Sequence, residues 1–195
     1  MFLAASLVFR AGRTYDNNMN MKITANALPA TFTVLGIDPG LASTGYAVLC
    51  QPARGGVTCL GEGLITTSPE ASLEQRLRVI YLALDKILRE SGAQLMAVED
   101  LYTDYRNPTA AVLMGHARGA CLLAAAGQGV PVASYPPTRV KKSLTGNGRA
   151  SKRQMKAMVR VFLQLVQEPG SEHVADAMAV GLCHFHQRQA EAIRR

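Results

Sequence analysis

One apolar stretch of the chain carries a single carboxylate, followed at once by a Pro-Gly turn. The stretch reads TFTVLGIDPGLASTGYAVLC, residues 31–50, and the carboxylate is Asp38. Residues 32–37 have the β-branched and apolar composition of a buried strand, and residues 44–48 are typical of the strand that returns beside it. Burying an unpaired carboxylate is costly, so Asp38 must lie at a sheet edge in water or hold something positive.

Three further segments extend this hairpin into a sheet. Residues 56–67 form a third extended run, and the short connections favour an antiparallel meander. Residues 93–102 contain an apolar strand that ends in Glu99 and Asp100, and a preceding helix favours a parallel crossover beside the first strand. Residues 130–135 supply a fifth strand. We therefore expect an α/β fold whose five-stranded mixed sheet, with three antiparallel strands and then two parallel ones, is flanked by helices.

The predicted helices carry start and stop signals. Ser72 is expected to cap a helix that Gly92 ends, with Gln75 completing a capping box. Ser151 is expected to cap a later helix, and the final helix covers residues 171–189.

The length of 195 residues and a hydrophobic content of 48% suit one domain with a single sizeable core. We expect residues 1–30 to be a disordered N-terminal extension, residues 31–189 to be the domain, and residues 190–195 to be a tail. No apolar run is expected to reach the roughly 18 residues of a membrane span, and no signal peptide is expected. The four cysteines show no CxxC pair, which favours buried free thiols in a reducing cytosol. The CHFH run at residues 183–186 lacks a second ligand cluster for zinc.

The formal charge of +7 is unevenly distributed. No carboxylate occurs between Asp104 and Glu168, and the segment holds these ten basic residues: Arg106, Arg118, Arg139, Lys141, Lys142, Arg149, Lys152, Arg153, Lys156 and Arg160. A basic segment of this kind indicates a phosphate-bearing polymer as partner. A solvated charged face with no partner is the open alternative.

Three carboxylates stand in apolar surroundings: Asp38, Glu99 and Asp176. If the first and fourth strands are neighbours, Asp38 and Glu99 meet at one edge, and the final helix can bring Asp176 over them. Such a cluster needs cations, and divalent metals would relieve the repulsion and create a Lewis-acid site for phosphate. His173 lies three residues before Asp176 and so shares its helix face, as a ligand or a proton carrier. Taken singly, each acid could also be a helix cap or a surface charge.

Four motifs in this order resemble the RuvC family of Holliday-junction resolvases, within the ribonuclease H-like superfamily. They are LGIDPGLASTGYAV, AVEDLY, GHARG and HVADAMAVGLCH, and the resemblance covers about residues 34–187. It implies a metal-dependent endodeoxyribonuclease that nicks four-way DNA junctions symmetrically in recombination and repair. It also implies a homodimer, branch-migration proteins as partners, no membrane association, and a bacterial cytoplasmic, nucleoid-associated location.

The resemblance implies that Asp38, Glu99, His173 and Asp176 are the catalytic metal ligands, with two Mg²⁺ or Mn²⁺ ions per site. His173 departs from the aspartate found in many members, although other members have histidine. Imidazole suits Mn²⁺ better than Mg²⁺, so a stronger Mn²⁺ preference than that of a His173→Asp variant is expected.

The resemblance also assigns DNA-binding positions. Tyr102 matches an aromatic residue that meets bases at the junction centre, where stacking contributes about 1–3 kcal/mol. Lys141 and Lys152 match basic positions near the scissile phosphate. The basic segment adds the following DNA-binding candidates: Arg106, Lys142, Arg149 and Arg153. The helix of residues 108–126, with small residues on one face, is the candidate dimer interface, although packing in the chain's own core would explain that face too.

Three other functions stay open at this level. A junction- or RNA-binding module that has lost catalysis would keep the basic segment. A related fold would cleave RNA instead. An actin-like ATP-dependent enzyme shares the Asp-Gly type of opening motif, but it needs a second phosphate motif and about twice this length.

Overall fold

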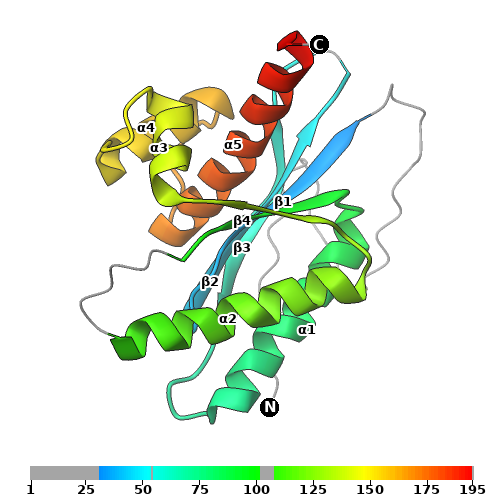
Figure 1. The fold of residues 1–195 in the computed structure, drawn as a ribbon, viewed down its shortest axis with the longest axis vertical. Coiled ribbons are helices and arrows are strands. Elements are labelled where there is room, and N and C mark those ends of the chain that lie inside the picture. The colour runs from blue at the N-terminus through cyan, green and yellow to red at the C-terminus, as the bar shows by residue number, and fades with distance from the viewer. Residues whose placement is uncertain (1–30, 54, 102–107, 195) are drawn as a thin grey trace.

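The computed structural model of the chain describes residues 31–53, 55–101 and 108–194 (Figure 1). The elements follow in the order β1 (Phe32–Asp38), β2 (Ser43–Gln51), β3 (Thr58–Thr66), α1 (Leu73–Ser91), β4 (Leu95–Glu99), α2 (Pro108–Gly127), β5 (Val132–Tyr135), α3 (Pro137–Thr145), α4 (Lys152–Phe162) and α5 (Glu172–Arg194). The predicted residues 1–30 extension, Tyr102 and Arg106 lie outside the described residues.

The five strands form one sheet in the order β3-β2-β1-β4-β5. β1 pairs antiparallel with β2 and parallel with β4, so the predicted meander and crossover are confirmed. In the β1–β4 register Ile37 lies opposite Val98. Asp38 and Glu99, the next residue of each strand, are therefore neighbours at the same edge of the sheet.

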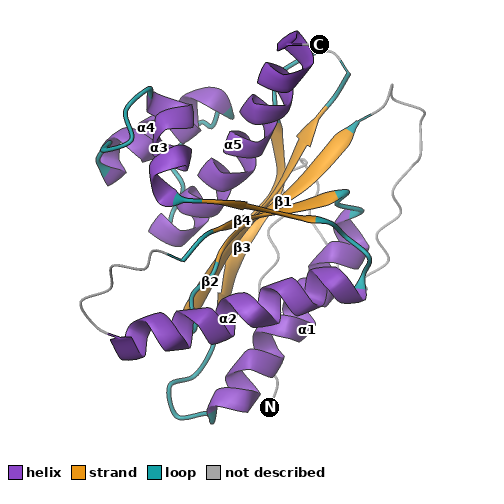
Figure 2. Cartoon of the chain, in the orientation of Figure 1, coloured by secondary structure: helices purple, strands orange, loops and turns teal. Residues whose placement is uncertain are grey.

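The two faces of the sheet are covered by different helices (Figure 2). Successive strand residues point to opposite faces. Leu35 and Ile37 of β1 enter a core with α1 and α2, whereas Val34 enters a second core with α3, α4 and α5. The sheet is thus buried on both sides, which explains the nearly continuous apolar run of β1.

Helix ends agree only in part with the sequence. Ser151 forms the predicted cap, because its hydroxyl accepts from the Gln154 amide and the Gln154 side chain accepts from the Ser151 amide. The capping box at Ser72 was wrong: its side chain makes no cap hydrogen bond, and its hydroxyl donates to Glu74 instead. The final helix continues to Arg194, beyond residue 189.

Helix α2 is more apolar than expected. The stretch Thr109–Gly127 is long and apolar enough to cross a membrane by length and composition alone, so the expectation that no run reaches this length was wrong. Core helices of soluble proteins meet the same criterion. Only 22% of the apolar window is buried in the chain, and Val112 and Leu123 are exposed.

The four cysteines are free, as predicted. Cys121 and Cys183 are buried, while Cys50 and Cys59 are half-buried. The β2–β3 register places Cys50 opposite Thr58 and Cys59 opposite Leu49, so the two thiols do not face each other across the hairpin.

Candidate active site

Two strand glycines bring helix α5 directly onto the sheet. A Cβ atom on Gly36 of β1 would lie 2.1 Å from the Ala177 carbonyl oxygen, and one on Gly45 of β2 would lie 2.0 Å from the His173 carbonyl oxygen. Any side chain at these positions would push the helix away. The backbone of α5 therefore packs against the backbones of β1 and β2, and its first turns lie beside Asp38.

Asp38 is the last residue of β1, and a buried hydroxyl shapes the turn that follows. Thr44 is fully buried, and its Oγ1 donates to the Gly40 carbonyl oxygen at 2.8 Å. On the α5 side, the Nδ1 atom of His173 lies 2.7 Å from Oδ2 of Asp38. The Asp38 side chain is 13% exposed and that of His173 is 49% exposed, so the pair spans the boundary between protein and solvent.

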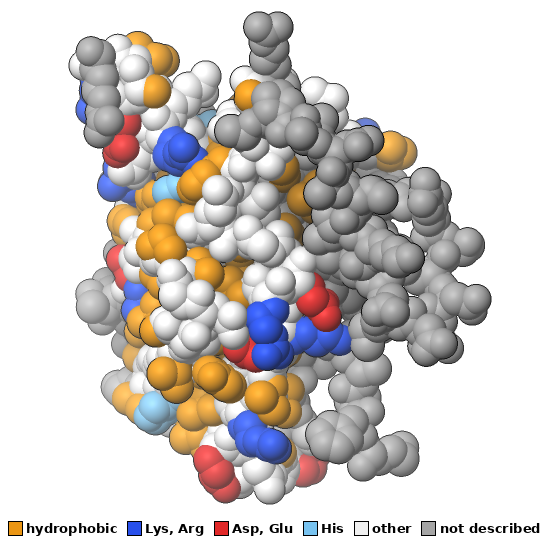
Figure 3. All heavy atoms as spheres, turned by 90° about the vertical axis from the view of Figure 1, so that its right-hand side faces the viewer, with side chains coloured by type: hydrophobic (Ala, Val, Ile, Leu, Met, Phe, Trp, Pro, Cys, Tyr) orange, Lys and Arg blue, Asp and Glu red, His pale blue; other side chains and the backbone are white. Residues whose placement is uncertain are grey.

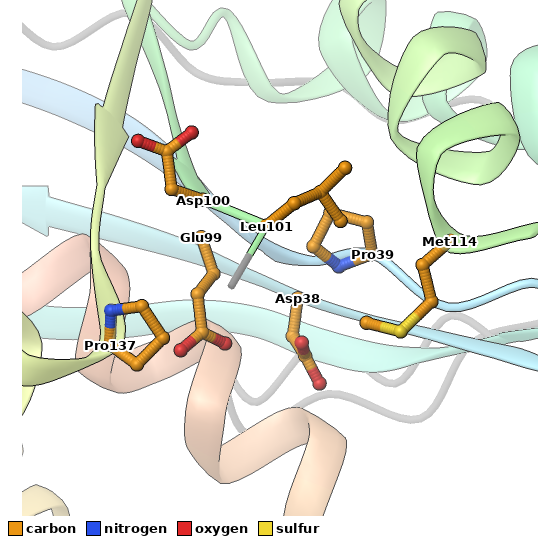
Figure 4. Close-up of a pocket in the computed structure, with 7 residues that line it drawn as sticks. All are labelled: Asp38, Pro39, Glu99, Asp100, Leu101, Met114 and Pro137. Carbon is orange, nitrogen blue, oxygen red and sulfur yellow. The ribbon is translucent and has the colours of Figure 1, made fainter. Parts of the chain in front are cut away.

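Glu99 ends β4 beside Asp38, and the interaction between the two carboxyl groups lowers the pKa of Asp38 and raises that of Glu99. Both point to the same side of the sheet, toward α5, whereas Asp100 points away (Figure 4). They line a cavity of about 100 Å³ whose other lining residues are Pro39, Asp100, Leu101, Met114 and Pro137.

A second cavity, of about 170 Å³, continues the site toward the basic helices. Glu99 and Asp176 line it together with Lys141 of α3 and Lys152 of α4. This cavity therefore joins two of the predicted acids to two of the predicted basic residues.

The pKa values of all three carboxyl groups are raised. Burial is the main cause for Glu99, whose pKa is raised to about 8, and the charges of Asp38 and Asp176 add to the shift. Burial is also the main cause for Asp176, whose pKa is raised to about 6, and the charge of Asp38 is the second cause. Burial also raises the pKa of Asp38, although the hydrogen bond from His173 opposes the change. The acids repel one another in a poorly solvated place, which is the electrostatic setting that a cation relieves.

The donor set of carboxylate oxygens and one imidazole suits a hard divalent cation such as Mg²⁺ or Mn²⁺. In the part of the chain that the structure describes, no three His, Cys, Asp or Glu side chains already converge as a complete metal shell. The four predicted ligands lie in the same region, and their side chains would have to move to hold an ion together.

The basic candidates differ in how close they lie to the acids. Lys141 is half-buried, and its charge opposes the rise in the pKa of Glu99. Lys152 is exposed and pairs with Glu172, yet its charge also acts on Asp176 and Asp38. The exposed candidates are Lys142, Arg149 and Arg153. The face drawn in Figure 3 carries scattered basic side chains with acidic ones among them.

The sequence interpretation missed the parts that assemble the site. Gly36 and Gly45 allow the backbone of α5 to pack directly against the sheet, and Met114 and Pro137 line the cavity. Glycine inside a strand pattern is a recognised sign of a close backbone approach, and that signal was present. No comparable signal marks Met114.

Comparison with known proteins places the chain among described relatives. A family model described as "Crossover junction endodeoxyribonuclease RuvC" matches residues 34–184. A protein of that name from Rhodopirellula baltica is 49% identical over 151 residues, which cover 77% of this chain and 84% of the relative. Another, from Alkaliphilus metalliredigens, is 39% identical over 78% of this chain and 92% of its own.

Solved structures agree with this assignment. The structure described as Thermus thermophilus RuvC in complex with Holliday junction substrate matches with a TM-score of 0.78 and 34% identity, covering 82% of this chain and 96% of the other. A yeast mitochondrial Holliday junction resolvase shares the fold, with a TM-score of 0.60 at 11% identity. The chain therefore belongs to the RuvC family of crossover junction endodeoxyribonucleases, within the ribonuclease H-like fold.

Proposed function

We propose that this chain is a structure-specific endonuclease that resolves four-way DNA junctions by symmetric hydrolysis of two phosphodiester bonds, in recombination and repair. The observation that carries the proposal is the meeting of three carboxyl groups, all with raised pKa values, where β1, β4 and α5 converge. Such an arrangement costs stability, which is typical of a functional site. Membership of the RuvC family and the relative solved with a Holliday junction support the choice of substrate.

Asp38, Glu99, Asp176 and His173 would hold Mg²⁺ or Mn²⁺, with two ions per site. When bound, such ions make water a better nucleophile and stabilise the negative charge that develops on phosphate. The chain's own part is to place the oxygen donors. The His173 hydrogen bond favours ionised Asp38, because donation to a carboxylate stabilises its charged form.

An imidazole among the ligands favours Mn²⁺. We therefore expect the ratio of nicking rates in Mn²⁺ and Mg²⁺ to be higher for the native chain than for a His173→Asp variant. Equal ratios in the two proteins would contradict this part of the proposal.

The basic residues of α3 and α4 would hold the DNA backbone. Lys141 and Lys152 border the cavity that contains Glu99 and Asp176, which suits contact with the phosphate to be cut. The exposed residues Lys142, Arg149 and Arg153 would bind neighbouring phosphates, and such binding weakens steeply with salt. Tyr102 would stack on a base at the junction centre and Arg106 would contact the backbone nearby.

A homodimer fits a junction with two strands to be nicked, because a two-fold enzyme matches a nearly two-fold substrate. Helix α2 is the proposed interface. It is the most apolar long helix described, and its exposed side chains include Val112 and Leu123, 58% and 63% exposed. Branch-migration proteins and the nucleoid are the proposed setting.

The deciding experiment is cleavage of a synthetic four-way junction, with a linear duplex of the same sequence as control, in Mg²⁺ and in Mn²⁺. Paired symmetric nicks in the junction alone are expected. Asp38→Asn and Glu99→Gln should abolish them, whereas Glu90→Gln, which removes a carboxylate that pairs with Lys86 on α1, should not.

Other outcomes would identify another function. Tight junction binding without nicks in either metal would indicate a binding module that has lost catalysis. Cleavage of an RNA duplex or stem in preference to the junction would indicate a ribonuclease.

A further inference from the structure

Arg118 of α2 connects two strands of the sheet beside the candidate active site. Its Nη2 atom donates to Oδ1 of Asp100 at 2.9 Å and to Oγ of Ser134 at 2.7 Å. The Arg118 side chain is 18% exposed, and its Nε atom is buried without a hydrogen-bond partner in the described structure. The two hydrogen bonds and the partial burial restrict the position of the side chain, although the unsatisfied Nε donor costs stability.

Both partners of Arg118 lie at the level of Glu99. Asp100 directly follows Glu99, and its amide donates to the Tyr135 carbonyl oxygen at 2.9 Å, which is the last bond between this end of β4 and β5. Ser134 pairs with Val98 in the parallel register. Because side chains alternate along a strand, Asp100 and Ser134 face α2, whereas Glu99 points to the opposite side of the sheet, as Figure 4 shows for Glu99 and Asp100.

Glu99 needs to be held in place. Its carboxyl group is poorly solvated and lies beside those of Asp38 and Asp176, and both conditions disfavour the ionised form of Glu99 at this position. Among the described residues, β4 ends at Glu99, and the Asp100 amide makes the last bond of this end to β5. A clamp on the adjacent residue from the opposite face of the sheet would prevent the strand end from turning.

We propose that Arg118 is a positioning residue for Glu99: by binding Asp100 and Ser134 together, it fixes the end of β4 and directs the Glu99 carboxyl group into the cavity. The inference rests on the proposed nuclease function. Helix α2 contributes to the site in a second way, since Met114, one turn before Arg118, lines the same cavity.

The test compares Arg118→Gln, Asp100→Ala and the double variant on the four-way junction, using the full chain with Mg²⁺. A displacement of the order of 1 Å lowers an enzymatic rate by about 10²-fold. We therefore expect the single-turnover nicking rate of each variant to fall by about 10- to 100-fold, while junction Kd stays within about twofold. The double variant should be no slower than the slower single variant, because both remove the same clamp. Arg118→Lys, which keeps the charge near Asp100, should recover part of the rate.

A matched control removes an ion pair of similar length elsewhere. Arg89 pairs with Asp85 at 2.8 Å on α1, so Arg89→Gln should leave the nicking rate unchanged. Thermal unfolding of every variant separates loss of fold from loss of position, and Asp100→Ala changes a side chain that is 42% exposed and so keeps the test valid if Arg118 variants unfold.

Three results would overturn the inference. Weaker junction binding at an unchanged nicking rate would make Arg118 a DNA contact. Multiplying losses in the double variant would show that Arg118 and Asp100 act separately, and unchanged rates in both single variants would show that the clamp has no role. If the native chain cuts no junction at all, the proposed function fails instead.

Discussion

The two faces of the sheet are built on different principles. On the α1 and α2 face, the helices contact the strands through large apolar side chains such as Leu35, Ile80 and Leu84. On the α5 face, helix and strand backbones meet at Gly36 and Gly45 without a side chain between them. The first arrangement gives stability and tolerates some repacking, whereas the second sets how closely Asp176 approaches Asp38.

The largest combined effect on stability and nicking is expected at the backbone contact. Gly36→Ala would place a methyl group 2.1 Å from the Ala177 carbonyl oxygen, and neither backbone can give way cheaply. We expect stability to fall by about 3 kcal/mol and nicking to be lost even where the variant is folded. Thermal unfolding and junction cleavage measure the two effects. Gly56→Ala, at a position with nothing within 4 Å, is the control and should change neither.

The opposite face gives the contrasting substitution. Leu84→Ala in α1 removes a fully buried side chain and should cost about 2–5 kcal/mol. The nicking rate per folded molecule, measured well below the unfolding temperature, should stay close to the native rate. A large loss of rate in the folded variant would show that the two faces are not independent.

Asp176→Asn should stabilise the metal-free protein while abolishing nicking. The pKa of Asp176 is raised to about 6 from 3.8. Between these two pH values the folded state therefore keeps a proton that the unfolded state has already lost. The associated stability is full below about pH 4 and is lost as pH rises through 6. The free energy of unfolding of the variant should therefore be about 1–3 kcal/mol higher than that of the native chain at pH 7. Below pH 4 the two should be equally stable. Glu172→Gln is the control. Its partner Lys152 lowers the pKa of Glu172, so this variant should lose stability at pH 7 rather than gain it.

An intermediate effect is expected on assembly. Leu123→Glu puts a charge on the exposed side of α2 and should convert the proposed dimer to a monomer, as measured by sedimentation, with reduced symmetric nicking. Leu82→Glu is the matched control, because Leu82 is 45% exposed on α1 of the same sheet face. A native chain that sediments as a monomer at micromolar concentration would contradict the proposed interface.

The smallest effect concerns His184 on the α5 face. Burial lowers the pKa of His184, whose Nδ1 lies 2.7 Å from the Tyr135 hydroxyl oxygen in a hydrogen bond. As pH falls, His184 therefore takes up a proton in the unfolded state before it does so in the folded state. The neutral, buried His184 contributes to stability above pH 6.5, and this contribution is lost as pH falls further. Replacing His184 by Gln should reduce the loss of thermal stability between pH 7 and pH 5. His116→Gln, at an exposed position on α2, should leave that loss unchanged.

The order and pairing of the strands could be predicted because alternation, apolar runs and crossover rules are local or nearly local signals. The neighbourhood of Asp38 and Glu99 followed from that topology. The closeness of Gly36 to Ala177 did not, because it depends on two segments far apart in the chain. Ser72 occupies the N-cap position of α1 as predicted, but the capping box is missing because its hydroxyl donates to Glu74, two residues away. The link from Arg118 to Asp100 and Ser134 is a tertiary contact that no spacing rule indicates.

The backbone contact between β1 and α5 also bears on how freely this chain can change over evolutionary time. When a core side chain is exchanged for one of another size, the helix that rests on it has to shift. A helix seated on glycine has no such side chain beneath it. Sequence drift in the remainder of the core can therefore accumulate without altering the spacing of Asp38 and Asp176, provided that Gly36 and Gly45 are kept.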